Sequence, residues 1–188
     1  GNDPQLPMDT WPVTPAAIDY LFLTHAHIDH IGRVPELIQR GFDGEIICSH
    51  PTKALINPML ADAMTFSRWP QQTVESLQES IDDLSWGFEF NQSFDLEKGV
   101  SFKMGRAGHI LGSAFVRFQD DGSGWSVLFS GDLGSADTPI LRDPDSPDPA
   151  DRVVMESTYG DRRHANRGRR IEQLGRVLTR ALSDGGKV

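Results

Sequence analysis

One short segment of the sequence holds a concentration of metal-binding side chains: His25, His27, Asp29 and His30. Imidazole nitrogens and carboxylate oxygens are ligands that zinc and similar divalent cations accept. The apolar run Tyr20–Leu23 just before them predicts a buried strand that ends in a loop. On such a loop His25 and His27 can bind one metal, while Asp29 and His30 can reach a second. A solvated histidine-rich loop is the alternative, and ligands this closely spaced argue against it.

Two later segments offer further ligands close to predicted strands. His109 lies in a glycine-flanked segment between two strands, where glycine lets the backbone approach a metal or a substrate closely. Asp132 follows the apolar run Val127–Phe129, and a carboxylate at a strand end can bridge two metals. Either residue alone would indicate little, since an aspartate beside glycine at a strand end is usually part of a turn. Together with the histidine segment they predict a metal site.

The elements that must position these residues are short strands and amphipathic helices. We expect strands at 20–23, 46–48, 100–104, 114–118, 127–129 and 153–155. We expect helices at 35–41, 52–66, 73–85 and 171–182. Asn57-Pro58 predicts a break or kink in the second of these helices, and the proline- and aspartate-rich stretch 143–151 predicts a surface loop. Helices that flank several short apolar strands favour an α/β layered domain.

The composition limits the class of protein. A chain of 188 residues with 38% hydrophobic residues suits one globular domain with a sizeable core. No apolar run reaches the roughly 18 residues of a membrane span. The net charge of −9 argues against binding to nucleic acid through a generally basic surface, although bound cations would offset part of it. The single cysteine, Cys48, excludes an intramolecular disulfide, is expected to be buried, and suits a cytoplasmic location.

The order and spacing of the six candidate ligands resemble the metal motifs of the metallo-β-lactamase superfamily. Three segments, 107–114, 129–134 and 156–162, resemble its β-CASP branch, which comprises nucleases of RNA processing and some of DNA repair. The resemblance implies a partial metallo-β-lactamase-like αββα sandwich that lacks the first strands, the cap domain and the C-terminal return. Residues 1–160 would form the N-terminal portion of the core, and residues 161–188 the start of the β-CASP cap segment.

The resemblance also implies a role for each ligand. The first zinc would be bound by His25, His27 and His109, the second by Asp29 and His30, with Asp132 as the bridge. Asp29 would in addition orient the hydroxide that two zinc ions activate. Glu156 would support a later histidine that protonates the leaving oxygen; the alternative is a strand-end residue that caps the next turn. Manganese is the alternative metal, because nitrogen and oxygen ligands do not select zinc alone.

The function implied is that of an RNA phosphodiesterase with endonuclease or 5′-exonuclease action, or both. Single-stranded DNA is the less favoured substrate, because Glu156 and the three residues after it resemble the RNA-directed members. Two alternatives stay open: a small-molecule ester, thioester or lactone hydrolase, and a non-catalytic RNA-binding relative. The opening Gly1-Asn2-Asp3-Pro4 resembles the middle of a longer protein, so we expect a fragment with weak or no activity by itself. A homo-oligomer is also left open.

Overall fold

The structure, a computed structural model, describes residues 11–162 and 167–186, which fall into two compact units. The first unit runs to Glu156 and contains all the strands, and the second begins at Ser157. In the second unit the helix α5 (Arg170–Ser183) is the main element, as its apolar spacing predicts. No helix within the described ranges is long and apolar enough to cross a membrane.

The first sheet of the first unit is parallel. Its strands, in the order in which they lie side by side, are β1 (Tyr20–Phe22), β2 (Glu45–Ser49) and β3 (Ser85–Phe88). Parallel neighbours need crossover connections, which are usually helical. Those connections contain α1 (Ile28–Ile31) and α2 (Val34–Gln39) before β2, and α3 (His50–Phe66) and α4 (Gln71–Leu84) before β3.

The helix α3 begins where the sequence supplies a cap and ends at Phe66, as predicted. The Ser49 hydroxyl accepts a hydrogen bond from the backbone N–H of Thr52, and Pro51 fits the first turn, where an N–H has no helical partner. Of the break or kink predicted at Asn57-Pro58, the break does not occur, since the helix continues through Pro58 to Phe66. Burial of Ile56 before the proline and of Leu60 after it provides the packing that offsets one missing backbone hydrogen bond.

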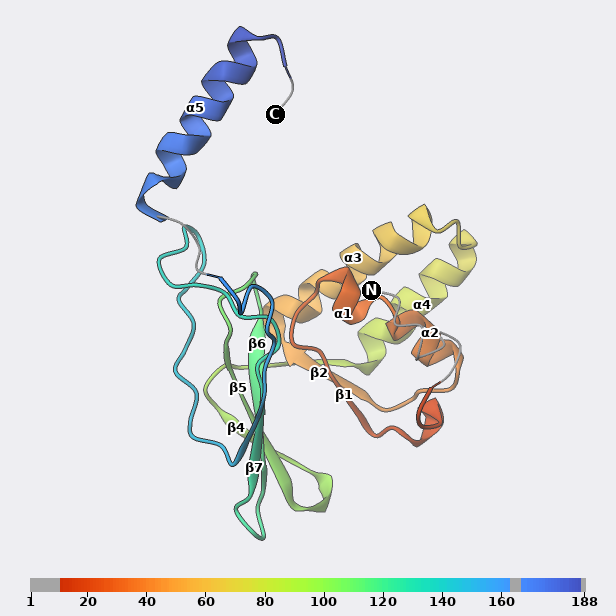
Figure 1. The fold of residues 1–188 in the computed structure, drawn as a ribbon. Helices are drawn as coiled ribbons and strands as arrows, with labels where there is room; N and C mark the ends of the chain where they lie inside the picture. The colour runs from red at the N-terminus through yellow and green to blue at the C-terminus, as the bar shows by residue number, and fades with distance from the viewer. Residues whose placement is uncertain (1–10, 163–166, 187–188) are drawn as a thin grey trace. The chain divides into compact units, whose positions relative to one another are not determined.

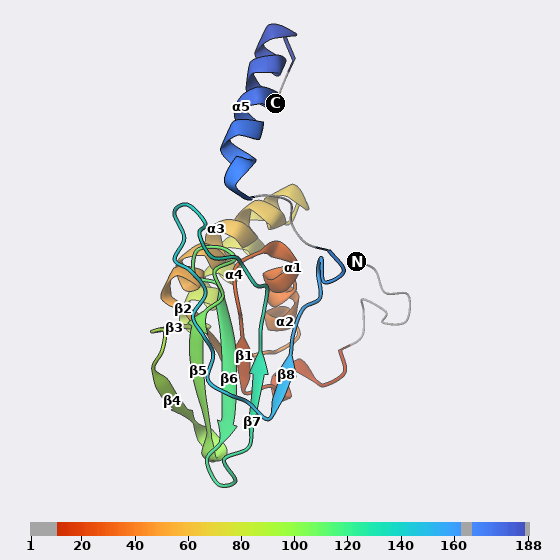
Figure 2. The ribbon, with the colours of Figure 1, turned by 60° about the vertical axis from the view of Figure 1, so that its left-hand side comes forward.

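The second sheet has five strands, seen side by side in Figure 2. In spatial order they are β4 (Ser93–Leu96), β5 (Val100–Arg106), β6 (Ala114–Asp120), β7 (Ser126–Phe129) and β8 (Arg152–Val154). The first four pair antiparallel, and β8 adds parallel to β7. The strands β3 and β4 were not predicted from the sequence. The other expected strands are confirmed to within one or two residues at each end, which is the usual uncertainty of a strand boundary.

Two apolar layers hold the first unit together. One lies between the first sheet and its helices and includes Ile46 and Ile56; the other lies between the two sheets and includes Ile47 and Phe102. Ile46 and Ile47 point to opposite faces because side chains alternate along a strand. Figure 1 shows the first sheet between the helices α1–α4 and the second sheet. The predicted α/β fold class is confirmed, with one helical layer and two sheets in the first unit.

The outer face of the second sheet is crossed by the predicted loop 143–151, which has no regular structure. The loop is tied to the sheet by charges: Lys103 Nζ lies 2.7 Å from Asp148 Oδ2, and Arg106 Nη1 lies 3.3 Å from Asp145 Oδ2. These ion pairs attach the loop to β5, beside the segments that hold the candidate ligands.

Candidate metal centre

The histidine segment lies between β1 and α1, as its sequence predicts. His25 is fully buried, and its Nδ1 lies 3.1 Å from the Thr24 hydroxyl oxygen. His27 precedes the first turn of α1, which places Asp29 and His30 on that turn. The tight change from extended to helical backbone is what brings four ligands of one short segment to a single end of the sheet.

His109 lies in the connection between β5 and β6, where a buried serine supports it. The Ser113 hydroxyl accepts hydrogen bonds from the backbone N–H groups of His109 at 2.9 Å and Ile110 at 3.2 Å. Gly108 has a φ of +69°, a conformation that favours glycine. The carbonyl of Gly112 accepts from the Ser49 hydroxyl at 2.6 Å, which ties the connection to the start of α3.

Asp132 follows β7, and two glycines let its loop pack against the other ligand segments. A side chain at Gly131, whose φ is +53°, would place its Cβ 2.8 Å from the Thr24 Cβ. A Cβ at Gly134 would lie 1.7 Å from the carbonyl oxygen of Gly108. Both glycines therefore stand where two backbones meet, one beside His25 and one beside His109. Close contact between loops is what brings ligands from both sheets together.

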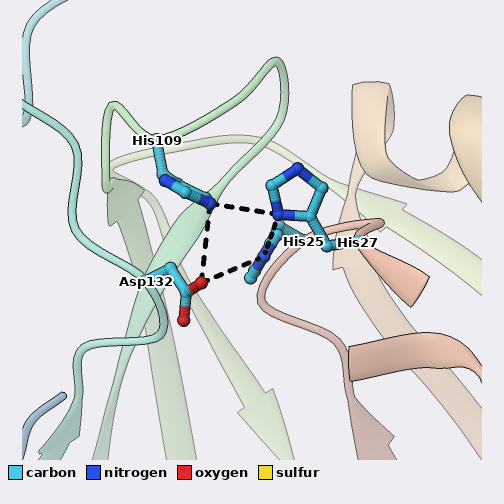
Figure 3. A group of neighbouring side chains, drawn as sticks. All are labelled: His25, His27, His109 and Asp132. Carbon is cyan, nitrogen blue, oxygen red and sulfur yellow. Dashed lines mark hydrogen bonds and ion pairs between the residues drawn. The ribbon is translucent and has the colours of Figure 1, made fainter. Parts of the chain in front are cut away.

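Four ligand atoms from these segments meet in one group, shown in Figure 3. His25 Nε2 and His109 Nε2 each lie 3.1 Å from His27 Nδ1. Asp132 Oδ2 lies 3.7 Å from His25 Nε2 and 3.5 Å from His109 Nε2. A tetrahedral zinc with bonds of about 2.0–2.1 Å needs ligand atoms about 3.3–3.4 Å apart. Four of the six separations scatter around that value, and all four atoms lie within 4.8 Å of one another, so the group has the donors and the approximate spacing for one divalent metal.

A second, more open set shares Asp132 with the first. His30 Nε2 lies 3.3 Å from Asp132 Oδ1 and 3.5 Å from Asp29 Oδ2. The Asp29 side chain is 75% exposed. Asp132 thus presents Oδ2 to the first set and Oδ1 to the second, which is the arrangement that a bridging carboxylate needs. Both distances to His30 are short enough for the donors to share a cation.

The surroundings of His25 disfavour its protonated form. Burial, and then the neighbouring imidazole of His30, lower the pKa of His25 from 6.5 to about 4, against the opposing effect of Asp132. His25 is therefore neutral at neutral pH. In the tautomer with its proton on Nδ1, facing Thr24, the lone pair of Nε2 points into the group and needs no proton to leave before a metal binds.

Glu156 lies just after β8 and contacts the Asp132 loop. Its Oε1 accepts a hydrogen bond from the backbone N–H of Leu133 at 2.6 Å, and its own N–H donates to the Ser130 hydroxyl at 3.2 Å. Ser130 and Leu133 stand on either side of Gly131-Asp132. The carboxylate of Glu156 therefore holds the backbone next to Asp132.

Three further residues of interest lie apart from this group. His50 begins α3, and its half-exposed imidazole Nε2 lies 3.7 Å from Glu89 Oε1. Cys48 is fully buried in β2, and burial raises the pKa of its thiol to about 12, so the thiol stays protonated. His164, which by its sequence position after Arg162-Arg163 could equally lie near a substrate or be a simple exposed histidine, lies outside the described residues.

Sequence reasoning did not single out Ser113 or Gly134. Ser113 is 3% exposed and holds the His109 backbone, and Gly134 makes the contact with Gly108. The available signal was their position, since each is a small residue two to four positions after a candidate ligand. Small residues are common in loops, so position alone does not distinguish support for a ligand from an ordinary turn.

The family model described as "Metallo-beta-lactamase superfamily" matches residues 2–165 of this chain. The chain belongs to the metallo-β-lactamase superfamily. Among solved structures of this fold, unliganded yeast PDE1 is similar, with a TM-score of 0.51 and 16% identity over 66% of this chain and 37% of that one. At such low identity the likeness supports the fold alone.

Several relatives within the superfamily are named as ribonucleases. Ribonuclease TTHA0252 of Thermus thermophilus is 37% identical over 174 residues, which are 93% of this chain and 39% of the relative. Endoribonuclease YSH1 of Candida glabrata is 30% identical over 91% of this chain and 23% of its own length. An RNase J-like protein of Methanocaldococcus jannaschii is 30% identical over 92% and 39%. The names agree with the predicted RNA-processing β-CASP branch, and the chain spans about two fifths or less of these relatives.

Proposed function

We propose that this chain supplies the metal centre of an RNA phosphodiesterase. The observation that carries the proposal is the position of Asp132, whose two oxygens face two different sets of ligands. A pair of neighbouring metals is a common device for phosphodiester hydrolysis, because both the attacking and the leaving oxygen need stabilisation. The ribonuclease names of relatives that align with nine tenths of this chain support RNA as the substrate.

The distances between the ligand atoms define two sets of residues, and each set would hold one metal. His25, His27, His109 and Asp132 would hold the first, and Asp29, His30 and Asp132 the second. When bound, zinc ions would lower the pKa of coordinated water and neutralise charge on the phosphate, and manganese is a second candidate for this donor set.

The chain's own carboxylates have three tasks in this proposal. Asp29 is exposed beside His30 and would accept a hydrogen bond from the attacking water, which fixes the direction of its lone pair. Asp132 sets the distance between the two ligand sets. Glu156 positions Asp132 through the Leu133 N–H, and so would act on the reaction without touching the substrate.

We also propose a mode of cleavage, a division of the chain and a cellular compartment. We infer endonuclease or 5′-exonuclease action, or both, and we assign residues 161–188 to the beginning of a β-CASP cap segment and residues 1–160 to the core. The buried, unpaired Cys48 suits a reducing compartment such as the cytoplasm.

The test compares substrates on the protein in its full natural length, loaded with zinc or with manganese. Labelled single-stranded RNA, single-stranded DNA of the same sequence and a 4-nitrophenyl ester are offered in parallel, and bound metal is counted by elemental analysis. We expect RNA to be cleaved fastest, with two metal ions per chain. Hydrolysis of the ester alone would refute the nuclease assignment and favour a small-molecule hydrolase.

A matched pair of variants tests the bridging role. Asp132→Ala should reduce RNA cleavage by several orders of magnitude and lower the bound metal, because both ligand sets lose a donor. Asp95→Ala removes an exposed aspartate on β4 and should leave both readouts unchanged. RNA binding without cleavage by the metal-loaded wild type would instead indicate a non-catalytic relative.

A further inference from the structure

A pocket of about 470 Å³ in the first unit adjoins the metal centre. The two share one connection: His109 points into the group of ligands, while its neighbours Gly108 and Ile110–Ser113 line the pocket. The pocket is within the size range of sites that bind small organic ligands, about 300–1,000 Å³. A substrate held at the metals therefore has room to place a neighbouring group here.

One wall of the pocket contains an aromatic ring and a guanidinium group that already contact each other. The guanidinium carbon of Arg106 lies 4.7 Å from the centre of the Phe90 ring. Asp145 fixes this arginine, since Asp145 Oδ2 accepts from the Arg106 backbone N–H at 2.9 Å and from Nη1 at 3.3 Å. Aromatic rings and guanidinium planes are the surfaces on which the bases of single-stranded RNA stack. A base can therefore stack here without a prior rearrangement of these two side chains.

The rim of the pocket adds apolar surface and a cation. Leu111 is 59% exposed, and Ile140 is fully exposed with a φ of +81°, a conformation that costs energy for a β-branched residue. Arg142 is exposed and has no ion pair or hydrogen bond within the described part of the chain. Apolar contacts beside an available guanidinium match a nucleotide, which has a base at one end and a phosphate at the other.

We infer that this pocket binds the base of a nucleotide next to the scissile phosphate of single-stranded RNA. The base stacks against Phe90 and Arg106, and Arg142 pairs with a flanking phosphate. The inference deepens the proposed function and rests on it for the identity of the substrate. It also explains how a chain with a net charge of −9 can hold RNA, since contact is concentrated at a few groups.

Binding is tested first, on the metal-free protein in its full natural length, so that no cleavage occurs. Fluorescence anisotropy with a labelled single-stranded RNA should show a Kd about 5- to 100-fold higher for Phe90→Ala, as expected for loss of one stacked base. Arg142→Ala, at an exposed position where misfolding is not expected, should also raise the Kd. Phe66→Ala removes an exposed phenylalanine outside the pocket and serves as the matched control. Unchanged Kd values for both pocket variants would overturn the inference.

Cleavage then locates the nucleotide. A set of RNA oligonucleotides with one abasic residue, moved step by step along the strand, should show a fall in kcat/KM at one position near the cleavage site in the wild type. In Phe90→Ala that fall should shrink, because the base has already lost one of its two stacking partners. If RNA is cleaved but kcat/KM does not depend on the abasic position, base binding in the pocket is refuted while the proposed function stands. Hydrolysis of esters without RNA cleavage would refute the proposed function itself.

Discussion

Substitution of Gly134 by alanine should separate the two loops that bring His109 and Asp132 together. The added Cβ would lie 1.7 Å from the Gly108 carbonyl oxygen and 2.0 Å from its carbon. Ordinary contacts begin at 3.4 Å, so one backbone must move by about 1.7 Å, the difference between the two values. The atoms in conflict belong to backbone on both sides, and no flexible side chain can turn away instead.

The consequence for the ligands follows from their present spacing. His109 Nε2 and Asp132 Oδ2 are 3.5 Å apart. A displacement of that size along the line joining them would bring the separation to about 5 Å, beyond the about 3.3–3.4 Å that a tetrahedral zinc can span. The first set would keep at most three ligands, and we expect the zinc affinity to fall by at least about 10- to 100-fold, the effect of disturbing a supporting contact.

The assay is zinc competition against a chromogenic chelator, with circular dichroism and a thermal melt to confirm that the variant folds. Gly122→Ala is the control, because its Cβ would meet its nearest neighbour, Asp120 Oδ1, at 3.4 Å in the turn between β6 and β7. A folded Gly134→Ala protein that binds zinc as tightly as the wild type would show that this contact does not set the ligand spacing.

Three further predictions concern supporting contacts. Ser113→Ala should weaken zinc binding by about 10-fold, because it removes the hydroxyl that holds the His109 backbone; isothermal titration measures this, and unchanged affinity would contradict it. The Cys48 thiol should resist Ellman's reagent in the native protein, since burial raises its pKa to about 12, and should react once per chain in guanidinium; rapid native labelling would show that β2 opens. Partial burial raises the pKa of Asp145, but hydrogen bonds, above all from the Arg106 backbone N–H, outweigh that effect and hold the pKa below its usual range. A carboxyl whose pKa is depressed in the folded protein stabilises the fold above its unfolded-state pKa of about 3.9, and this stabilisation is lost as the pH falls through its folded-state pKa. The difference in unfolding free energy between wild type and Asp145→Asn, measured by urea unfolding, should therefore shrink between neutral pH and pH 3. A difference independent of pH would refute this.

The ligands of the candidate site could be chosen from the sequence because their chemistry is rare and their spacing is local. His25, His27 and His30 lie within a few residues, and strand ends bring His109 and Asp132 to the same region. The bridging place of Asp132 was expected from the resemblance, but which of its oxygens faces which set could not be predicted, since that depends on loops from two sheets. The same holds for the supporting contacts, which involve backbone groups that have no pattern in sequence.

The unpredicted strands have a similar physical cause. β3 contains Trp86 and Gly87, which give no alternation of apolar and polar residues. A Cβ at Gly87 would lie 2.4 Å from the His50 imidazole, so glycine is required for α3 to begin beside this strand. The strand is specified by pairing with β2 and by packing, not by its own residues. The continuity of α3 through Pro58 has the same origin, because tertiary burial on both sides outweighs a local preference.

The ligands of the first set come from both sheets: His25 and His27 follow β1, whereas His109 and Asp132 follow β5 and β7. A metal bound there would act as a cross-link between two layers that otherwise adhere through side-chain packing, a few hydrogen bonds and an ion pair. Its binding free energy would then add to the resistance of the layers to separation, by about 2.7 kcal/mol at a free metal concentration 100 times the Kd. Availability of metal in the surroundings would thus regulate the lifetime of the folded protein as well as its chemistry.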